Sequence, residues 1–157
     1  MISVKDEIMR RLAVLVGLDV SGIGHAADML TLQFGPLRQV TSQRGTQKRL
    51  GSWALHVQCN WRCELAGEIF ANEADFRRSD DEVNRVTDRL NALLVVPVPA
   101  VVESVSASVS GGASITLSHG LIIVIEPAGV AAEEDWRLFA PGTDEDHFVI
   151  EGGRIDP

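Results

Sequence analysis

The most regular pattern along the chain is a strict alternation of apolar and polar side chains over residues 53–65. The apolar positions are Trp53, Leu55, Val57, Cys59, Trp61, Cys63 and Leu65, and the polar positions include His56, Gln58, Asn60, Arg62 and Glu64. Successive side chains of a β-strand point to opposite faces, so this period of two predicts one long, half-buried strand. We expect its apolar face to pack against helices and its polar face to carry a row of hydrogen-bonding groups.

Helical periodicity occurs in two other segments, residues 4–16 and 80–94, where apolar side chains recur every three or four positions. Ser79 precedes the second segment and Glu82 follows three positions later, a capping-box pattern. Shorter apolar or alternating segments predict further strands at residues 26–34, 37–41, 68–71, 101–109, 114–118, 121–126, 135–139 and 147–150, with a polar loop at 42–51. This order of elements predicts an α+β fold: a single domain, residues 1–157, with a mainly antiparallel sheet and two helices packed on one face.

Charge is distributed unevenly along the chain. The net charge of −8 argues against general nucleic-acid binding, yet residues 29–63 contain no Asp or Glu and include five Lys and Arg side chains. Arg44, Lys48 and Arg49 belong to the polar loop, and we expect them on an exposed, mobile hairpin tip that contacts an anionic ligand or an acidic segment of a partner. The alternative is a loop whose charges only increase solubility.

The two cysteines, Cys59 and Cys63, lie on the apolar face of the predicted strand, four residues or about 13 Å apart. A disulfide bond needs a Cα separation of about 4.4 to 6.8 Å, so the two cannot pair within a regular strand. We therefore expect reduced, buried thiols in a cytoplasmic protein. The longest unbroken apolar runs, such as residues 121–125, are far shorter than the roughly 20 residues that span a bilayer, so we predict no membrane segment.

The polar face of the predicted strand is the strongest candidate for a binding site. His56, Gln58, Asn60 and Arg62 would follow one another at about 6.6 Å, a spacing at which neighbouring pairs can grip a small polar anion. The alternative is an ordinary solvated face of an antiparallel sheet. A cysteine nucleophile is disfavoured because Cys59 would point away from His56, and we predict no catalytic residues.

A metal site is also disfavoured. Residues 144–147 combine three acidic side chains with a histidine, but they lack the spacing of zinc or calcium motifs. Charge runs of this kind are typical of solvated loops. We predict neither a metal ion nor a cofactor.

Three stretches of the chain resemble a bacterial protein family of unknown function. They are residues 22–35, residues 53–62 with the sequence WALHVQCNWR, and the ending from residues 136–141 to 147–150. The resemblance covers about a quarter of the chain. It implies a bacterial cytoplasmic source, and it implies no activity, cofactor or catalytic residue.

Two functional hypotheses follow. The leading one is a non-enzymatic binding or interaction module, with an unknown protein or a small anionic ligand as its partner, because a basic hairpin is set in an acidic chain without a catalytic motif. A sharper form is an immunity-type or antitoxin-type protein whose acidic surface covers a basic toxin. The rival is a small enzyme or small-molecule-binding protein that uses the polar face of residues 53–65.

Overall fold

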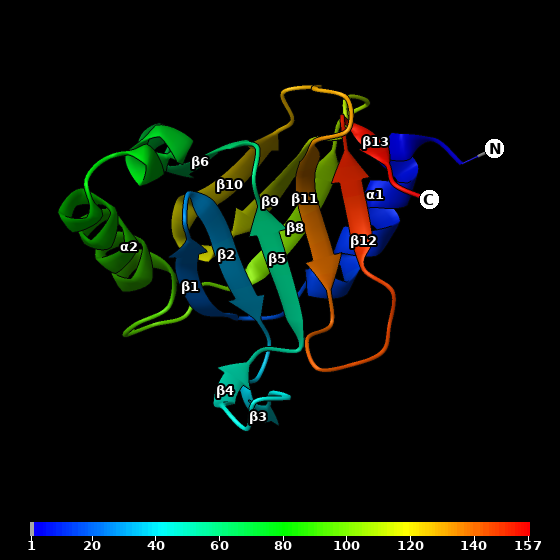
Figure 1. Ribbon diagram of the computed structural model, residues 1–157. Helices are drawn as coiled ribbons and strands as arrows, with labels where there is room; N and C mark the ends of the chain where they lie inside the picture. Colours follow the sequence, from blue (N-terminus) through cyan, green and yellow to red (C-terminus); the bar gives the residue numbers. More distant parts are fainter. Residues whose placement is uncertain (1) are drawn as a thin grey trace.

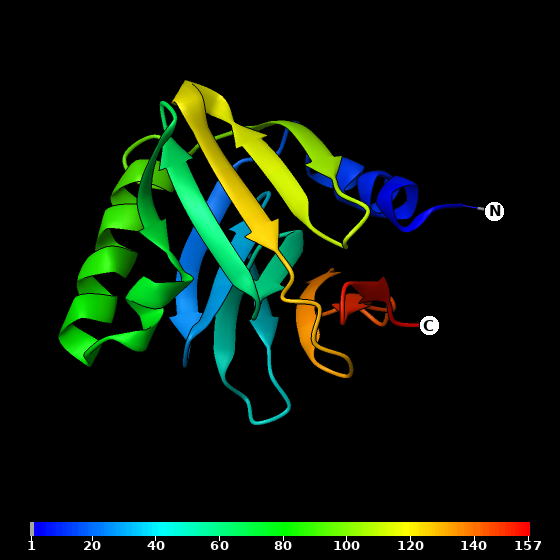
Figure 2. The same cartoon turned by 90° about the horizontal axis from the view of Figure 1, so that it is seen from above.

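The computed structural model describes residues 2–157 and contains, within that range, two α-helices and 13 strands. Two antiparallel sheets, of six and five strands, face each other across one hydrophobic core (Figure 1, Figure 2). The two remaining strands form a hairpin of their own. The α+β class and the antiparallel pairing predicted from the sequence are thereby confirmed.

The strands follow their chain order across the six-stranded sheet but not across the five-stranded sheet. The six-stranded sheet runs β1 (Val20–Ala26), β2 (Met29–Phe34), β5 (Trp53–Val57), β11 (Glu134–Phe139), β12 (Phe148–Glu151) and β13 (Arg154–Ile155). The five-stranded sheet runs β7 (Glu68–Asn72), β6 (Asn60–Leu65), β10 (Leu121–Glu126), β9 (Ala113–Leu117) and β8 (Val102–Ala107). The hairpin consists of β3 (Arg38–Thr41) and β4 (Gln47–Leu50). The helical segments are α1 (Val4–Leu12), α2 (Asp80–Leu94) and the short 3-10 turns η1 (Ala13–Leu15), η2 (Glu73–Arg77) and η3 (Ser118–Gly120).

The expectation of one continuous strand over residues 53–65 is wrong. The chain bends at Gln58 and Cys59, so that β5 belongs to the six-stranded sheet and β6 to the five-stranded one. At the bend the amides of Gln58 and Cys59 both donate to the carbonyl of Asp135, at 2.8 and 3.0 Å. The alternation persists because both halves turn their odd-numbered side chains toward the same core, where Leu55, Val57 and Trp61 are buried. Periodicity alone therefore does not reveal the bend.

The helices close opposite ends of the core and do not share one face of a single sheet. Helix α2 packs beside β1 and η2, whereas α1 packs against β8 (Figure 1, Figure 2). The buried core consequently comes mainly from the facing sheets, and Trp53 and Leu65 at the two extremes of the alternation are only partly buried. Within residues 2–157, neither helix has both the length and the apolar character needed to cross a membrane.

Helix α2 matches the bounds predicted from its periodicity. The Ser79 side chain accepts a hydrogen bond from the Glu82 amide at 3.4 Å, which satisfies one of the amide groups left free at the start of a helix. Val83, Leu90 and Leu94 form its buried side. The sequence pattern missed β1, whose Gly22 and Gly24 interrupt the apolar alternation, and β4, which is polar on both faces.

Candidate functional site

The hairpin β3–β4 extends away from both sheets (Figure 1). Its base is held by the Arg38 guanidinium, which donates to the Pro141 carbonyl, and by the Gly51 amide, which donates to the Gln33 side chain at 3.0 Å. A Cβ atom on Gly51 would lie 2.5 Å from the carbonyl oxygen of Phe34, so glycine permits this close approach. The hairpin is therefore anchored at its base and exposed along both strands.

The structure places Arg44, Lys48 and Arg49 on this hairpin, and all three are exposed. Arg44 occupies the tip, while Lys48 and Arg49 lie on β4 opposite Val40 and Gln39 and not in a loop. Adjacent strand residues point to opposite faces, so Lys48 and Arg49 lie on different faces of the hairpin. Within residues 2–157, none of the three basic residues forms an ion pair. The hairpin thus presents positive charge to two sides.

The polar row proposed from the sequence is divided by the bend. His56 lies on β5 and Gln58 at the bend, whereas Asn60 and Arg62 lie on β6 in the other sheet. Gln58 donates from Nε2 to Glu134 Oε2 at 2.8 Å, and Asn60 is exposed. The four residues therefore do not form one continuous site.

His56 belongs to a cluster on the outer face of the six-stranded sheet, which we call the His56 cluster: His56, Glu134, Arg137, Phe139 and His147. The His56 ring meets Phe139 edge-on with centroids 4.9 Å apart, and His147 stacks on the same ring at 4.3 Å. Arg137 faces His56 across the strand pair and donates from Nε to Glu134 Oε2 at 2.9 Å. Most of the cluster's polar groups thus have partners within it.

The surroundings of His56 in this cluster favour the neutral form of its ring. Burial lowers the pKa of His56, and the nearby Arg137 lowers it further, while Glu134 acts in the opposite direction. Hydrogen bonding from Arg137 lowers the pKa of Glu134. Because a guanidinium can only donate, the 2.9 Å contact between Arg137 Nη1 and His147 Nδ1 makes that nitrogen an acceptor.

Sequence reasoning did not connect Glu134, Arg137, Phe139 or His147 with His56, because they are distant from it along the chain, and it weighed His147 only as part of a metal site at residues 144–147. A usable signal was present in the predicted strand at residues 135–139. Trp136 and Leu138 face the core there, so Arg137 must face outward.

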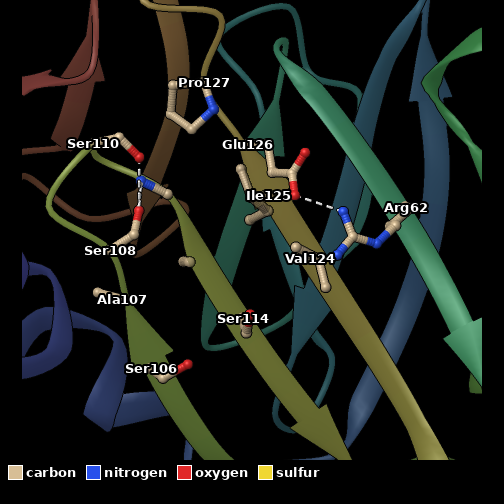
Figure 3. Close-up of a pocket in the computed structure, with 12 residues that line it drawn as sticks. Arg62, Ser106, Ala107, Ser108, Ser110, Ser114, Val124, Ile125, Glu126 and Pro127 are labelled. Carbon is tan, nitrogen blue, oxygen red and sulfur yellow. Dashed lines mark hydrogen bonds and ion pairs between the residues drawn. The ribbon is translucent and has the colours of Figure 1, made fainter. Parts of the chain in front are cut away.

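Arg62 lines a different feature, an open pocket of about 490 Å³ on the five-stranded sheet, which we call the serine pocket (Figure 3). Its polar lining comes largely from the four serines of β8, β9 and the turn between them: Ser106, Ser108, Ser110 and Ser114. Figure 3 shows the Ser108 and Ser110 hydroxyls hydrogen-bonded to each other, at 2.9 Å, across the pocket from Arg62. The alternation of valine and serine in residues 101–109 was the sequence signal for this hydroxyl-rich face.

The charge of Arg62 is compensated within the fold. Its guanidinium donates to Glu64 Oε2 and to Glu126 Oε1, both at 2.6 Å. These hydrogen bonds raise the pKa of Arg62 and hold the side chain along the sheet (Figure 3). Because the Glu126 carboxylate lines the serine pocket and Arg62 is already paired with two carboxylates, the pocket suits a neutral ligand with hydroxyl groups better than the anion expected from the sequence.

Both cysteines are free thiols, as the sequence predicted. Burial raises the pKa of Cys59 to about 12 and that of Cys63 to about 12. Since the thiolate is the reactive form, neither cysteine is activated for nucleophilic attack. Across residues 2–157, no group of three acidic, histidine or cysteine side chains is arranged to hold a metal ion.

Comparison of the chain with models of protein families, with curated proteins and with solved structures gives no match. Function is therefore inferred from the geometry and charges of the chain itself.

Proposed function

We propose that the protein is a non-enzymatic interaction module that binds an acidic segment of a partner protein through the hairpin β3–β4. The observation that carries the proposal is that this hairpin lies outside both sheets and exposes Arg44, Lys48 and Arg49, which make no ion pair within residues 2–157. The anchored base supports the proposal, because a rigid attachment lowers the entropy lost when the hairpin is ordered by a partner.

The charge of the whole chain favours a specific geometry of approach. The chain as a whole is acidic, with 22 Asp and Glu against 14 Lys and Arg, so its net charge repels an acidic partner while the hairpin is a local basic exception. This uneven charge distribution orients the approaching partner toward the hairpin and disfavours other orientations. It contributes more to the rate and specificity of association than to the affinity. An immunity or antitoxin role is the alternative form, in which the acidic body covers a basic partner.

Nuclear magnetic resonance locates the binding surface. Titration of the labelled protein with poly-L-glutamate should shift the amide signals of residues 38–50 and leave those of the serine pocket in place. A triple variant, Arg44→Ala with Lys48→Ala and Arg49→Ala, should lose these shifts. The matched control removes three exposed cations elsewhere, by Lys5→Ala with Arg85→Ala and Arg89→Ala. This control should still show the shifts of residues 38–50 on titration. Shifts that are spread evenly over the surface, or that persist at full size in the hairpin variant, would contradict the proposal.

A second candidate function is binding of a small molecule on the face of β6, and the serine pocket with Arg62 favours it. A neutral polyhydroxyl compound such as glucose is a suitable probe, because hydroxyls can pair with both serines and carboxylates. Saturable shifts at Ser106 and Ser114 that disappear in Arg62→Gln would support this candidate. No shift at either serine would exclude the probe's chemical class from this pocket.

A further inference from the structure

An open cleft separates α1 from the inner face of the six-stranded sheet, at the end where β5 begins. It has a volume of about 410 Å³ and shares no lining residue with the hairpin β3–β4 or the serine pocket. Its floor is apolar and aromatic, formed by Trp53, Leu138 and Phe148. A pocket of this size with an aromatic floor is within the range that accepts small organic ligands.

The two sides of the cleft carry opposite charges. Arg10 and Arg11 come from the last turn of α1, and Glu145 and Asp146 come from the loop between β11 and β12. No ion pair joins these two sides in residues 2–157. The cleft therefore holds two unlike charged groups apart across an apolar floor.

The basic side is held in position by contacts of its own. Arg10 and Arg11 both donate to Glu7, with Arg10 Nε at 3.0 Å from Oε2 and Arg11 Nε at 3.1 Å from Oε1. The Arg11 guanidinium lies over the Phe148 ring, 5.2 Å from its centroid. Two guanidiniums sharing one carboxylate leave a net positive charge, together with N–H donors that Glu7 does not use, on two residues that line the cleft.

We propose that this cleft binds a small zwitterionic ligand with an apolar body, of the size of a dipeptide. The ligand carboxylate pairs with Arg10 and Arg11, its ammonium group pairs with Glu145 and Asp146, and its apolar side chains lie on Trp53 and Phe148. An extended dipeptide spans about 7 Å, so that its charged ends are farther apart than those of a single amino acid. Neither charged side alone explains the cleft, since an anion would be repelled by the loop and a cation by the helix.

The chain contains a natural reporter for this site. Of its three tryptophans, Trp61 and Trp136 are buried, with 3% and 0% of their surface exposed, and Trp53 is the one that lines the cleft. Titration with the dipeptide Leu-Leu should therefore change tryptophan emission in a saturable manner, and Trp53→Phe should abolish the change while calorimetry still detects binding.

Variants and blocked ligands test the two charged sides separately. Arg11→Gln, and separately Glu145→Gln with Asp146→Asn, should each weaken Leu-Leu binding by about tenfold, the effect of one charge-assisted hydrogen bond. The acidic-side variant should not weaken binding of N-acetyl-Leu-Leu, which has no ammonium group. Asp88→Asn with Glu103→Gln is the matched control for exposed acids and should bind as the original protein does.

Three results would overturn the assignment: no saturable emission change or heat with Leu-Leu, equal affinity for the dipeptide blocked at both ends, or unchanged affinity in both cleft variants. Urea midpoints of the variants, if equal to that of the original protein, show that any loss of binding is local. These variants leave the hairpin residues unchanged. A negative result with the dipeptide therefore does not affect the proposal that the hairpin binds an acidic partner.

Discussion

Two buried tryptophans of equal size should respond differently to the same substitution. Trp136 lies on β11, and its Nε1 donates to the Gly111 carbonyl at 2.9 Å, in the turn between β8 and β9 of the opposite sheet. Trp61 lies on β6, packs against Phe76 with centroids 5.1 Å apart, and its buried Nε1 has no hydrogen-bond partner among residues 2–157. Trp136→Phe therefore breaks a hydrogen bond between the sheets, while Trp61→Phe removes an unsatisfied donor.

The magnitude follows from the cost of an unpaired buried polar group, about 1–3 kcal/mol. Trp136→Phe leaves the Gly111 carbonyl without its indole donor, whereas Trp61→Phe relieves the same kind of cost. Both changes remove similar ring volume, so the two effects add, and we expect Trp136→Phe to lower the free energy of unfolding by at least about 2 kcal/mol more than Trp61→Phe. Trp61→Ala, which also removes the contact with Phe76, should cost about 3–5 kcal/mol.

Urea denaturation followed by far-ultraviolet circular dichroism measures the difference. With a slope of about 1–3 kcal/mol per molar urea, a gap of about 2 kcal/mol separates the two midpoints by roughly 1 M. Equal slopes for the two variants serve as the control that both unfold from comparable native states. A Trp61→Phe variant as destabilised as Trp136→Phe, or more so, would refute the reasoning.

Three further predictions concern chemistry and backbone geometry. Cys59 and Cys63 should label slowly with a thiol reagent in the native protein, because burial raises both pKa values to about 12, and rapid labelling without denaturant would show an exposed strand face. The free energy of unfolding should fall as the pH drops below about 6.5, because the pKa of His56 is lowered in the folded protein and the unfolded chain takes up a proton first. Urea titrations between pH 7.5 and 5.5 measure this dependence, and a His56→Gln variant should lose part of it. Gly51→Ala should destabilise the fold by about 1–3 kcal/mol, because its Cβ would meet the Phe34 carbonyl at 2.5 Å, and an unchanged urea midpoint would show that the hairpin base can move.

Local signals in the sequence predicted individual elements well. Helix α2 was predicted with its bounds and its Ser79 cap, because helical periodicity and capping are properties of adjacent residues. The hairpins that join β8, β9 and β10 follow from turn residues at short intervals. The pairing of β6 with β7 likewise follows from their closeness along the chain.

The division into two sheets was not predictable from those signals. The bend at residues 58–59 is set by the Asp135 carbonyl, whose position depends on how β11 pairs with β5. The candidate sites depend on the same long-range pairing: Glu126 neutralises Arg62 from β10, and Arg137 reaches His56 from β11. The exposed basic hairpin was predictable because its charges lack acidic neighbours in sequence, although the strand β4, polar on both faces, was not.

The salt dependence of binding to an acidic polymer tests the proposed interaction module most directly. Affinity for poly-L-glutamate would be measured by calorimetry at several salt concentrations for the original protein, the triple hairpin variant and the Lys5, Arg85 and Arg89 control. We predict that affinity falls steeply with salt in the original protein and in the control, and that the hairpin variant shows weak binding with little salt dependence. Equal affinities and equal salt dependences in the hairpin variant and the control would contradict a function centred on the hairpin β3–β4.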